Sequence, residues 1–131
     1  KISSSGVGQI LSSNEFYDYN AKYIDGKSST LLKPDIPDSS IRQIKKIAEQ
    51  AFKCVGCYGM SRVDFFLTKG KKAIVNEINT IPGFTDISMY PKLWDQSGIS
   101  YTKLLDKLIK LAEERKEKYI FETDYEGIRY D

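Results

Sequence analysis

Residues 62–79 carry the clearest alternation of hydrophobic and polar positions in the chain. Two runs rich in β-branched and aromatic residues, Arg62–Leu67 and Ala73–Asn79, flank the polar segment Thr68–Lys72. Runs of this length, separated by a short segment that contains glycine, predict the two strands of an antiparallel β-hairpin. Gly70 can supply the positive φ that a tight hairpin loop requires.

Four polar residues of this hairpin are predicted to share one face. Side chains alternate between the two faces of a strand, so Arg62 shares a face with Asp64, and Glu77 shares one with Asn79. A two-residue loop at positions 70 and 71, or a four-residue loop, would place Asp64 opposite Glu77. The same register would place Arg62 opposite Asn79. A three-residue loop would put the two carboxylates on opposite faces.

Two carboxylates in direct cross-strand register repel each other, so the pair predicts a compensating cation. Asp64, Glu77 and the amide oxygen of Asn79 are hard oxygen ligands, the set that suits Mg²⁺. The alternative, equally compatible with the spacing, is an ordinary solvated face. In that case Arg62 and the lysines of the turn neutralise the acids.

Two longer segments have the periodicity of amphipathic helices. The first runs from Ser40 to Val55, is capped by Asp38, Ser39 or Ser40, and is ended by Gly56. The second follows Ser100 as its cap and runs to about Lys118, with a predicted buried stripe of Leu104, Leu105, Leu108, Ile109, Leu111 and Ala112. The predicted fold class is α+β, with an antiparallel sheet, two main helices packed on one face and the polar site on the other.

The rest of the chain is less regular. Residues 1–14 begin with small polar residues and are expected to be a flexible start, and Phe16–Tyr23 is aromatic enough to form a strand. Residues 24–39 have no sustained period and are expected to form a long loop, which in compact domains is usually functional or disordered. Residues 82–98 are also predicted to be a loop, and residues 119–131 a tail.

Composition narrows the class of protein. The chain has 131 residues, 40% of them hydrophobic and 29% charged, which is ordinary for one soluble globular domain. A net charge of +2 lacks the basic excess of a nucleic-acid-binding surface. No apolar run approaches the roughly 18 residues of a membrane span, and no signal-peptide pattern opens the chain, so no membrane partner and a cytoplasmic location are expected.

Cys54 and Cys57 form a C-x-x-C pair, which is compatible with a redox pair or with half of a zinc site. The sequence contains no histidine and no other cysteine, so the chain cannot build a four-ligand zinc site from the usual residues. We therefore expect Cys54 at the end of a helix and Cys57 at the start of a strand, as small buried hydrophobes.

Several ordered motifs resemble the C-terminal part of the D-alanyl-D-alanine ligase family, in the ATP-grasp superfamily. They are Arg62-Val63-Asp64-Phe65-Phe66, then Asn76-Glu77-Ile78-Asn79-Thr80-Ile81-Pro82-Gly83-Phe84-Thr85, then Ser88-Met89-Tyr90-Pro91, with Phe16-Tyr17-Asp18-Tyr19-Asn20-Ala21-Lys22-Tyr23 upstream. The resemblance extends from about Gly8 to about Arg115. It implies that residues 1–118 are the ATP-grasp C-terminal subdomain and that residues 24–39 are an active-site lid.

The resemblance also implies roles for individual residues. Asp64, Glu77 and Asn79 would bind two magnesium or manganese ions that bridge the phosphates of ATP. Arg62 and the backbone N–H of Gly83 would stabilise the tetrahedral intermediate, and Ser88 would hold the carboxylate of the acceptor. In the upstream segment, Lys22 would contact the ATP phosphates, Phe16 would line the adenine pocket and Tyr23 would begin the lid.

The implied activity is ATP- and magnesium-dependent ligation of D-alanine to a second D-amino acid through an acyl phosphate, for peptidoglycan precursors. Ester-forming members of the family, which make D-alanyl-D-lactate, are expected to depart from tyrosine at the start of the lid. Tyr23 therefore favours D-alanine or D-serine as the acceptor, and products other than D-alanyl-D-alanine are associated with glycopeptide (vancomycin) resistance.

The expected partners are these small-molecule substrates and the missing N-terminal and central domains of the same enzyme, without which the fragment should be inactive. A homodimer is left open. Two alternatives remain: another ATP-grasp carboxylate-amine ligase, and a non-enzymatic module that binds a divalent cation.

Overall fold

The structure, a computed structural model, describes residues 1–11, 29–85 and 87–118. Along the chain its elements are β1 (Gln9–Leu11), β2 (Ser29–Leu31), α2 (Asp38–Cys54), β3 (Arg62–Leu67), β4 (Ala73–Asn79), α3 (Met89–Gln96) and α4 (Tyr101–Lys118). The predicted strand Phe16–Tyr23, the first part of the predicted lid and the predicted tail lie outside the described residues. The antiparallel α+β fold class is confirmed, with two small two-stranded sheets in the described part of the chain.

Strands β3 and β4 form the predicted hairpin, but its loop differs from the prediction. Thr68 N–H donates to the Lys72 carbonyl (3.0 Å), and Lys71 N–H donates to the Thr68 carbonyl (2.9 Å), so the loop proper is Lys69–Lys71. A three-residue loop commonly ends in a residue with positive φ. That residue is Lys71, with φ of 63°, and not Gly70 as we predicted.

An irregularity in β4 restores the register that the loop alone would have lost. Next to the loop the partners are Leu67 with Ala73, Phe66 with Ile74 and Phe65 with Val75. The register then shifts between Asp64 and Phe65, and Asn76 is left without a partner in a β-bulge. Beyond the bulge, Asp64 pairs with Glu77 and Arg62 with Asn79. The predicted site pairs are therefore confirmed, although the even-numbered loop from which we derived them is wrong.

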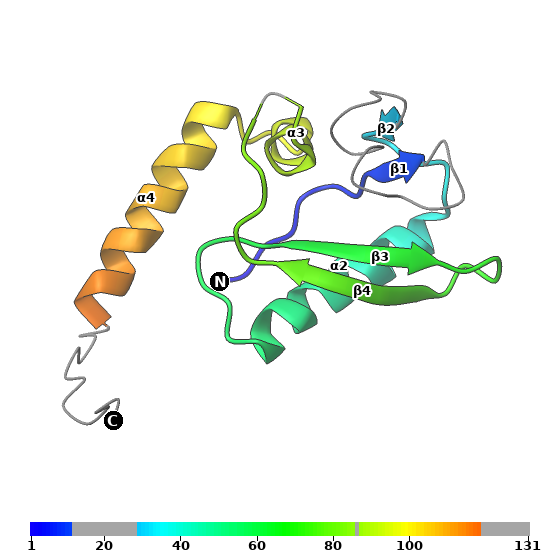
Figure 1. Cartoon of the computed structure of the whole chain (residues 1–131), viewed down its shortest axis with the longest axis horizontal. Coiled ribbons are helices and arrows are strands. Elements are labelled where there is room, and N and C mark those ends of the chain that lie inside the picture. The colour runs from blue at the N-terminus through cyan, green and yellow to red at the C-terminus, as the bar shows by residue number, and fades with distance from the viewer. Residues whose placement is uncertain (12–28, 86, 119–131) are drawn as a thin grey trace, which may run out of the picture.

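The two faces of the hairpin differ in what covers them. Ala73, next to the loop, is buried at 7% exposure, whereas Phe66 and Ile74 on the opposite face are 62% and 47% exposed. Helix α2 packs against β4 and β3 and lies behind the hairpin in Figure 1. The site pairs lie on the same face as Phe66 and Ile74, away from α2.

Helix α2 begins two residues earlier than predicted. Pro37 is its N-cap residue and no side chain caps it, so none of the predicted capping side chains plays that role. Ser40 is instead buried, and its hydroxyl lies 3.5 Å from the Lys71 carbonyl of the hairpin loop. The predicted end is confirmed, since Gly56 has a φ of 63° and donates to the Lys53 carbonyl.

The segment 82–98, predicted to be a loop, contains the helix α3. Pro91, a residue type that usually interrupts a helix, is the third residue of α3. The first N–H groups of a helix have no partner within it, so a proline there removes no helical hydrogen bond. Pro91 is buried, as is its neighbour Tyr90 at 7% exposure.

Helix α4 starts directly after Ser100, as predicted, but packs against α3 and stands to the side of the hairpin (Figure 1). The prediction of two helices on one face of the sheet is therefore wrong in detail. Only part of the predicted stripe is covered: Leu104 is buried at 4% exposure, whereas Leu105 and Ile109 are 37% and 59% exposed. Ala112 is exposed as well.

The first residues of the chain cross between the other elements. Strand β1 pairs antiparallel with β2, and neither strand is among the predicted elements. Ser4 Oγ donates to Glu49 of α2 (2.9 Å), and Gly6 N–H donates to Ser97 Oγ at the end of α3 (2.8 Å). Residues 1–11 thus contact both α2 and the end of α3.

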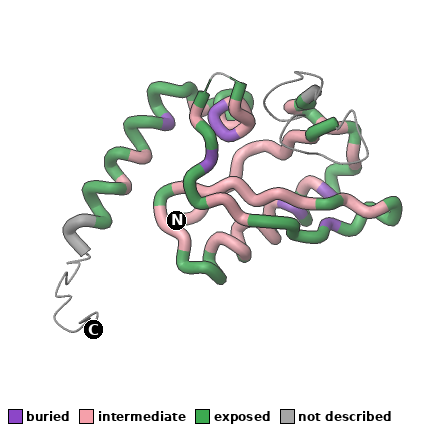
Figure 2. Tube along the Cα trace, in the orientation of Figure 1, coloured by how far each residue is buried: buried purple, intermediate pink, exposed green. Residues whose placement is uncertain are grey.

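Burial is concentrated in two small clusters, which Figure 2 shows as short purple stretches. Ile44 and Ala73 lie between α2 and the hairpin, and Tyr90 and Leu104 lie where α3 meets α4. The first cluster supports the strands that carry the polar face. The second supports the loop that follows β4.

Candidate functional site

Arg62 and Asp64 form a two-pronged ion pair on the exposed face of β3. Arg62 Nε donates to Asp64 Oδ1 and Arg62 Nη2 donates to Asp64 Oδ2, both at 2.8 Å. The two residues lie two positions apart on one strand, so their side chains share a face. The planar fork of the guanidinium matches the two carboxylate oxygens, which fixes both side chains relative to each other.

Glu77 and Asn79 face this pair from β4. Glu77 Oε1 lies 3.9 Å from Arg62 Nη2, and its side chain is 54% exposed, compared with 27% for Arg62 and 26% for Asp64. Asn79 Oδ1 accepts a hydrogen bond from Ile81 N–H at 3.0 Å. The guanidinium therefore sits between two carboxylates in cross-strand register and neutralises part of their charge.

The donor set fits a hard divalent cation. Ionised carboxylate oxygens offer about four lone-pair sites per group, of which the Arg62 fork uses two on Asp64. Within the described residues no group of three or more His, Cys, Asp and Glu side chains comes together as a metal cage. A pair of carboxylates and one amide is the partial set that Mg²⁺ completes with water and substrate phosphates. The assignment of Asp64, Glu77 and Asn79 as metal ligands stays a prediction.

Gly83 and Ser88 meet in the loop that leads from β4 to α3. A Cβ atom built on Gly83 would lie 2.9 Å from Ser88 Oγ, closer than real Cβ contacts, so any larger residue would displace the serine hydroxyl. Ser88 Oγ accepts a hydrogen bond from Thr85 N–H (3.0 Å) and lies 2.8 Å from Thr85 Oγ1. We did not single out Thr85, although its position three residues before Ser88 in a loop was an available signal.

Aromatic side chains hold this loop against α3 and α4. The Phe84 ring packs between Tyr90 and Tyr101, with centroid distances of 5.5 and 5.4 Å. Tyr101 Oη donates to the Phe84 carbonyl at 3.3 Å. Burial raises the pKa of Tyr90 above its ordinary value of 10.0, and a hydrogen bond with Trp94 lowers it in part. Tyr90 therefore stays neutral around neutral pH, as its apolar surroundings require.

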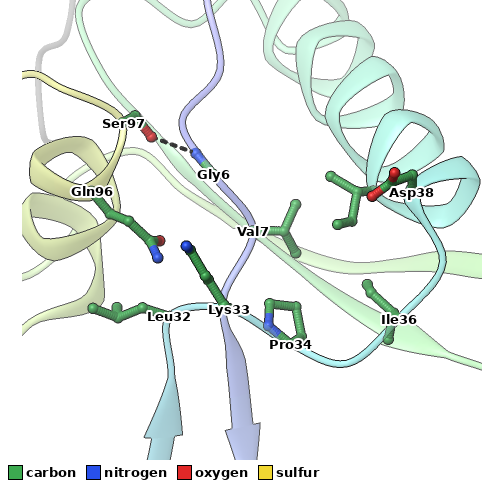
Figure 3. A pocket seen from close by; sticks show the side chains of 10 residues that line it. Gly6, Val7, Leu32, Lys33, Pro34, Ile36, Asp38, Gln96 and Ser97 are labelled. Atoms are coloured by element: carbon green, nitrogen blue, oxygen red, sulfur yellow. Dashed lines mark hydrogen bonds between the residues drawn. The ribbon is translucent and has the colours of Figure 1, made fainter.

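Three other predicted site residues, Phe16, Lys22 and Tyr23, lie outside the described residues. A hollow of about 400 Å³ lies where the first residues of the chain pass between the start of α2 and the end of α3 (Figure 3). Its lining contains no predicted site residue and consists of Gly6, Val7, Leu32, Lys33, Pro34, Ile36, Asp38, Ile41, Gln96 and Ser97.

The prediction for the cysteines is confirmed for the position of Cys54 at the end of a helix, but it is wrong for the burial of Cys54 and for the position of Cys57. Both are free thiols; Cys54 is exposed at the last residue of α2, and Cys57 is half-buried ahead of β3 and not in it. A turn at residues 55 and 56 and an irregular segment separate the end of α2 from the start of β3 at Arg62.

No described helix combines the length and apolar character that crossing a bilayer would require.

Comparison with known proteins gives consistent matches over most of the chain. The sequence profile of a family described as "D-ala D-ala ligase C-terminus" matches residues 1–110. A D-alanine–D-alanine ligase of Acetivibrio thermocellus is 51% identical over 122 residues, which are 92% of this chain and 32% of that protein. The chain thus spans about a third of the length of the curated relatives that it matches.

Solved structures agree with the sequence matches. The VanG D-Ala:D-Ser ligase from Enterococcus faecalis is 38% identical with a TM-score of 0.69, over 82% of this chain and 31% of that one. D-alanine–D-alanine ligase from Bacillus anthracis, complexed with ATP, is 34% identical with a TM-score of 0.69, over 88% of this chain and 38% of that one.

Proposed function

The chain belongs to the D-alanine–D-alanine ligase family, and we propose that it is the part of an ATP-dependent ligase that binds metal and phosphate. The whole enzyme would join D-alanine to a second D-amino acid for peptidoglycan precursors. The observation that carries the proposal is the cross-strand pairing of Asp64 with Glu77, beside the Arg62 fork, in a member of this family. The Bacillus anthracis ligase bound to ATP supports the choice of nucleotide.

Asp64, Glu77 and Asn79 would hold two magnesium ions, which supply neutralisation of the phosphate charge. The carboxylate of D-alanine attacks the γ-phosphorus of ATP, ADP leaves, and an acyl phosphate forms. The amine of the acceptor then attacks the acyl carbon and, after losing a proton, displaces inorganic phosphate to give the dipeptide. We propose that polar groups of this chain stabilise the negative charge that each step develops.

Arg62 is proposed to stabilise the oxyanion of the tetrahedral intermediate. Two of its N–H groups donate to Asp64, which orients the planar guanidinium, and the positive charge of this group suits a developing oxyanion. Asp64 thereby orients the Arg62 guanidinium, which would neutralise the charge of the oxyanion. Gly83 is proposed to offer its backbone N–H to the same oxyanion, and Ser88 its hydroxyl to the acceptor carboxylate.

The acceptor is proposed to be D-alanine or D-serine. The sequence has Tyr23 at the position where ester-forming members are expected to differ, and the VanG neighbour is a D-Ala:D-Ser ligase. A hydrophobic pocket discriminates weakly against one added hydroxyl, by on the order of a hundredfold, so the two amino acids are not separated.

The test uses the full-length enzyme, with D-alanine, D-serine and D-lactate offered as acceptors. We expect Glu77→Gln to raise the magnesium concentration needed for half-maximal ATP turnover by about tenfold or more, because it removes one charge from the metal ligands but keeps their shape. Glu113→Gln, the same change on an exposed residue of α4, is the matched control and should leave this magnesium concentration unchanged.

Three results would contradict the proposal. Unchanged magnesium dependence in Glu77→Gln would remove this residue from the metal site. Preferential ligation of D-lactate at neutral pH would overturn the acceptor assignment. Cation binding by wild-type enzyme without any nucleotide-dependent product would favour the non-enzymatic module, which would bind calcium as readily as magnesium.

A further inference from the structure

The hydroxyl of Ser88 is held by two groups of a single residue, Thr85. Thr85 N–H donates to Ser88 Oγ at 3.0 Å, and Thr85 Oγ1 lies 2.8 Å from the same atom. In the opposite direction, Ser88 N–H donates to the Thr85 carbonyl at 2.9 Å. The two residues therefore form a closed local unit at the end of the loop after β4.

This arrangement is unusual for the position that Ser88 occupies. Ser88 is the N-cap residue of α3, with φ of −69° and ψ of 136°, and a serine there commonly accepts a hydrogen bond from the N–H groups of its own helix. No such side-chain bond is present at α3. The hydroxyl is turned back toward Thr85 and is not used to cap the helix.

The direction of the Ser88 hydroxyl proton depends on which atom donates in the contact between Ser88 Oγ and Thr85 Oγ1. A serine hydroxyl has one proton and two lone pairs. Thr85 N–H occupies one lone pair, and the contact with Thr85 Oγ1 runs in either direction. When Thr85 Oγ1 is the donor, both lone pairs of Ser88 are filled and its proton must point away from Thr85.

We propose that Thr85 is a positioning residue that directs the Ser88 hydroxyl proton toward the carboxylate of the acceptor amino acid. The inference rests on the proposed function, in which Ser88 binds that carboxylate. An ionised carboxylate only accepts hydrogen bonds, so its binding selects the arrangement in which Thr85 donates both of its own. Thr85 acts through Ser88 and is not itself a contact of the acceptor.

The surrounding loop keeps Thr85 in place for this role. The preceding residue, Phe84, is packed between two aromatic rings, and its carbonyl accepts the Tyr101 hydroxyl at 3.3 Å. On the far side, Gly83 leaves open the space that a Cβ atom would take from Ser88 Oγ. The packing of Phe84 thus holds the backbone next to Thr85, and the absence of a side chain at Gly83 leaves room for Ser88 Oγ.

The experiment compares Thr85→Val with Thr85→Ser in the full-length enzyme. Valine keeps the shape and the backbone N–H but lacks the hydroxyl, whereas serine keeps both donors. We expect Thr85→Val to raise KM for the acceptor amino acid about tenfold, equal to about 1.4 kcal/mol, with kcat and the KM for ATP within about twofold of wild type. Thr85→Ser should stay within about twofold in all three.

A double-mutant cycle separates positioning from a general effect on structure. In a Ser88→Ala background, Thr85→Val should produce no further rise in the acceptor KM, because the group through which Thr85 acts is absent. An equal rise in both backgrounds, or an unchanged KM in Thr85→Val, would overturn the inference while the ligase activity stood. Wild-type enzyme that makes no D-amino-acid product would overturn the proposed function, and this inference with it.

Discussion

Deleting Asn76 should leave the hairpin intact, because Asn76 is the residue without a partner in the register of β3 and β4. Without it, Phe65 still pairs with Val75, and Asp64 still pairs with Glu77. Every other side chain also keeps its face. We expect the free energy of unfolding to change by less than about 1 kcal/mol, since no buried contact is lost and the irregular ladder becomes regular.

The matched control is deletion of Ile74, two positions away in the same strand. If the loop is kept, this deletion places Asn76 opposite Phe65 on the face toward α2. Val75, whose place Asn76 would take, is 41% exposed, so the amide would be only partly covered and its desolvation would cost about 1 kcal/mol at most, in addition to about 0.2–1 kcal/mol for loss of the Phe65–Val75 pair. If the bulge is kept instead, Lys72 must pair with Leu67 and turn toward α2, which is no cheaper. Either way we expect a loss of about 1–2 kcal/mol.

Both deletions are made in the full-length enzyme and compared by urea unfolding, followed by far-ultraviolet circular dichroism. The difference between the two midpoints is the informative quantity, because it cancels the general cost of shortening the strand. If deletion of Asn76 destabilised the protein as much as deletion of Ile74, the argument that the bulge only corrects the register would be refuted.

Two further predictions concern single residues. Lys71→Gly should raise the free energy of unfolding by about 0.5–1 kcal/mol, because relief of a positive φ of 63° outweighs the added chain entropy of glycine. Urea unfolding measures this free energy. The control Lys69→Gly, at a neighbouring loop residue without a positive φ, should not stabilise the protein. Since burial raises the pKa of Tyr90, the folded state holds the phenol proton more tightly than the unfolded state, so its contribution to stability is present below about pH 10 and is lost as pH rises further. Urea midpoints from about pH 9 to 11 should therefore fall less steeply in Tyr90→Phe than in wild type, and identical slopes would contradict the assignment.

The sequence was most informative where one local pattern determined the outcome. The β-branched runs predicted both strands of the hairpin with their observed bounds, and Ser100, as the expected cap, predicted the start of α4. The facing pairs of the site were also predicted correctly. The three-residue loop and the bulge each shift the register by one residue, and the two shifts cancel at the site. Neither has a sequence signature as clear as that of the strands.

Errors arose where packing between distant segments decides the structure. Pro91 is compatible with a helix only in its first turn, and the position of that turn depends on how Tyr90 packs against Phe84 of the preceding loop. Ile109 looked buried because its spacing fits the stripe of α4, but α3 covers only one side of that stripe. The pairing of β1 with β2 links segments on either side of residues 12–28, which a search for local periods does not detect.

The first residues of the chain have a consequence for the order of folding. The hydrogen bond from Gly6 to Ser97 spans 91 positions, and that from Ser4 to Glu49 spans 45. During synthesis these residues leave the ribosome before their partner at the end of α3 is made. Contacts of such separation carry a large loop-closure entropy and form late in folding, whereas the β3–β4 hairpin can close as soon as its second strand is made. The polar face should therefore take shape before residues 1–11 dock against α2 and the end of α3.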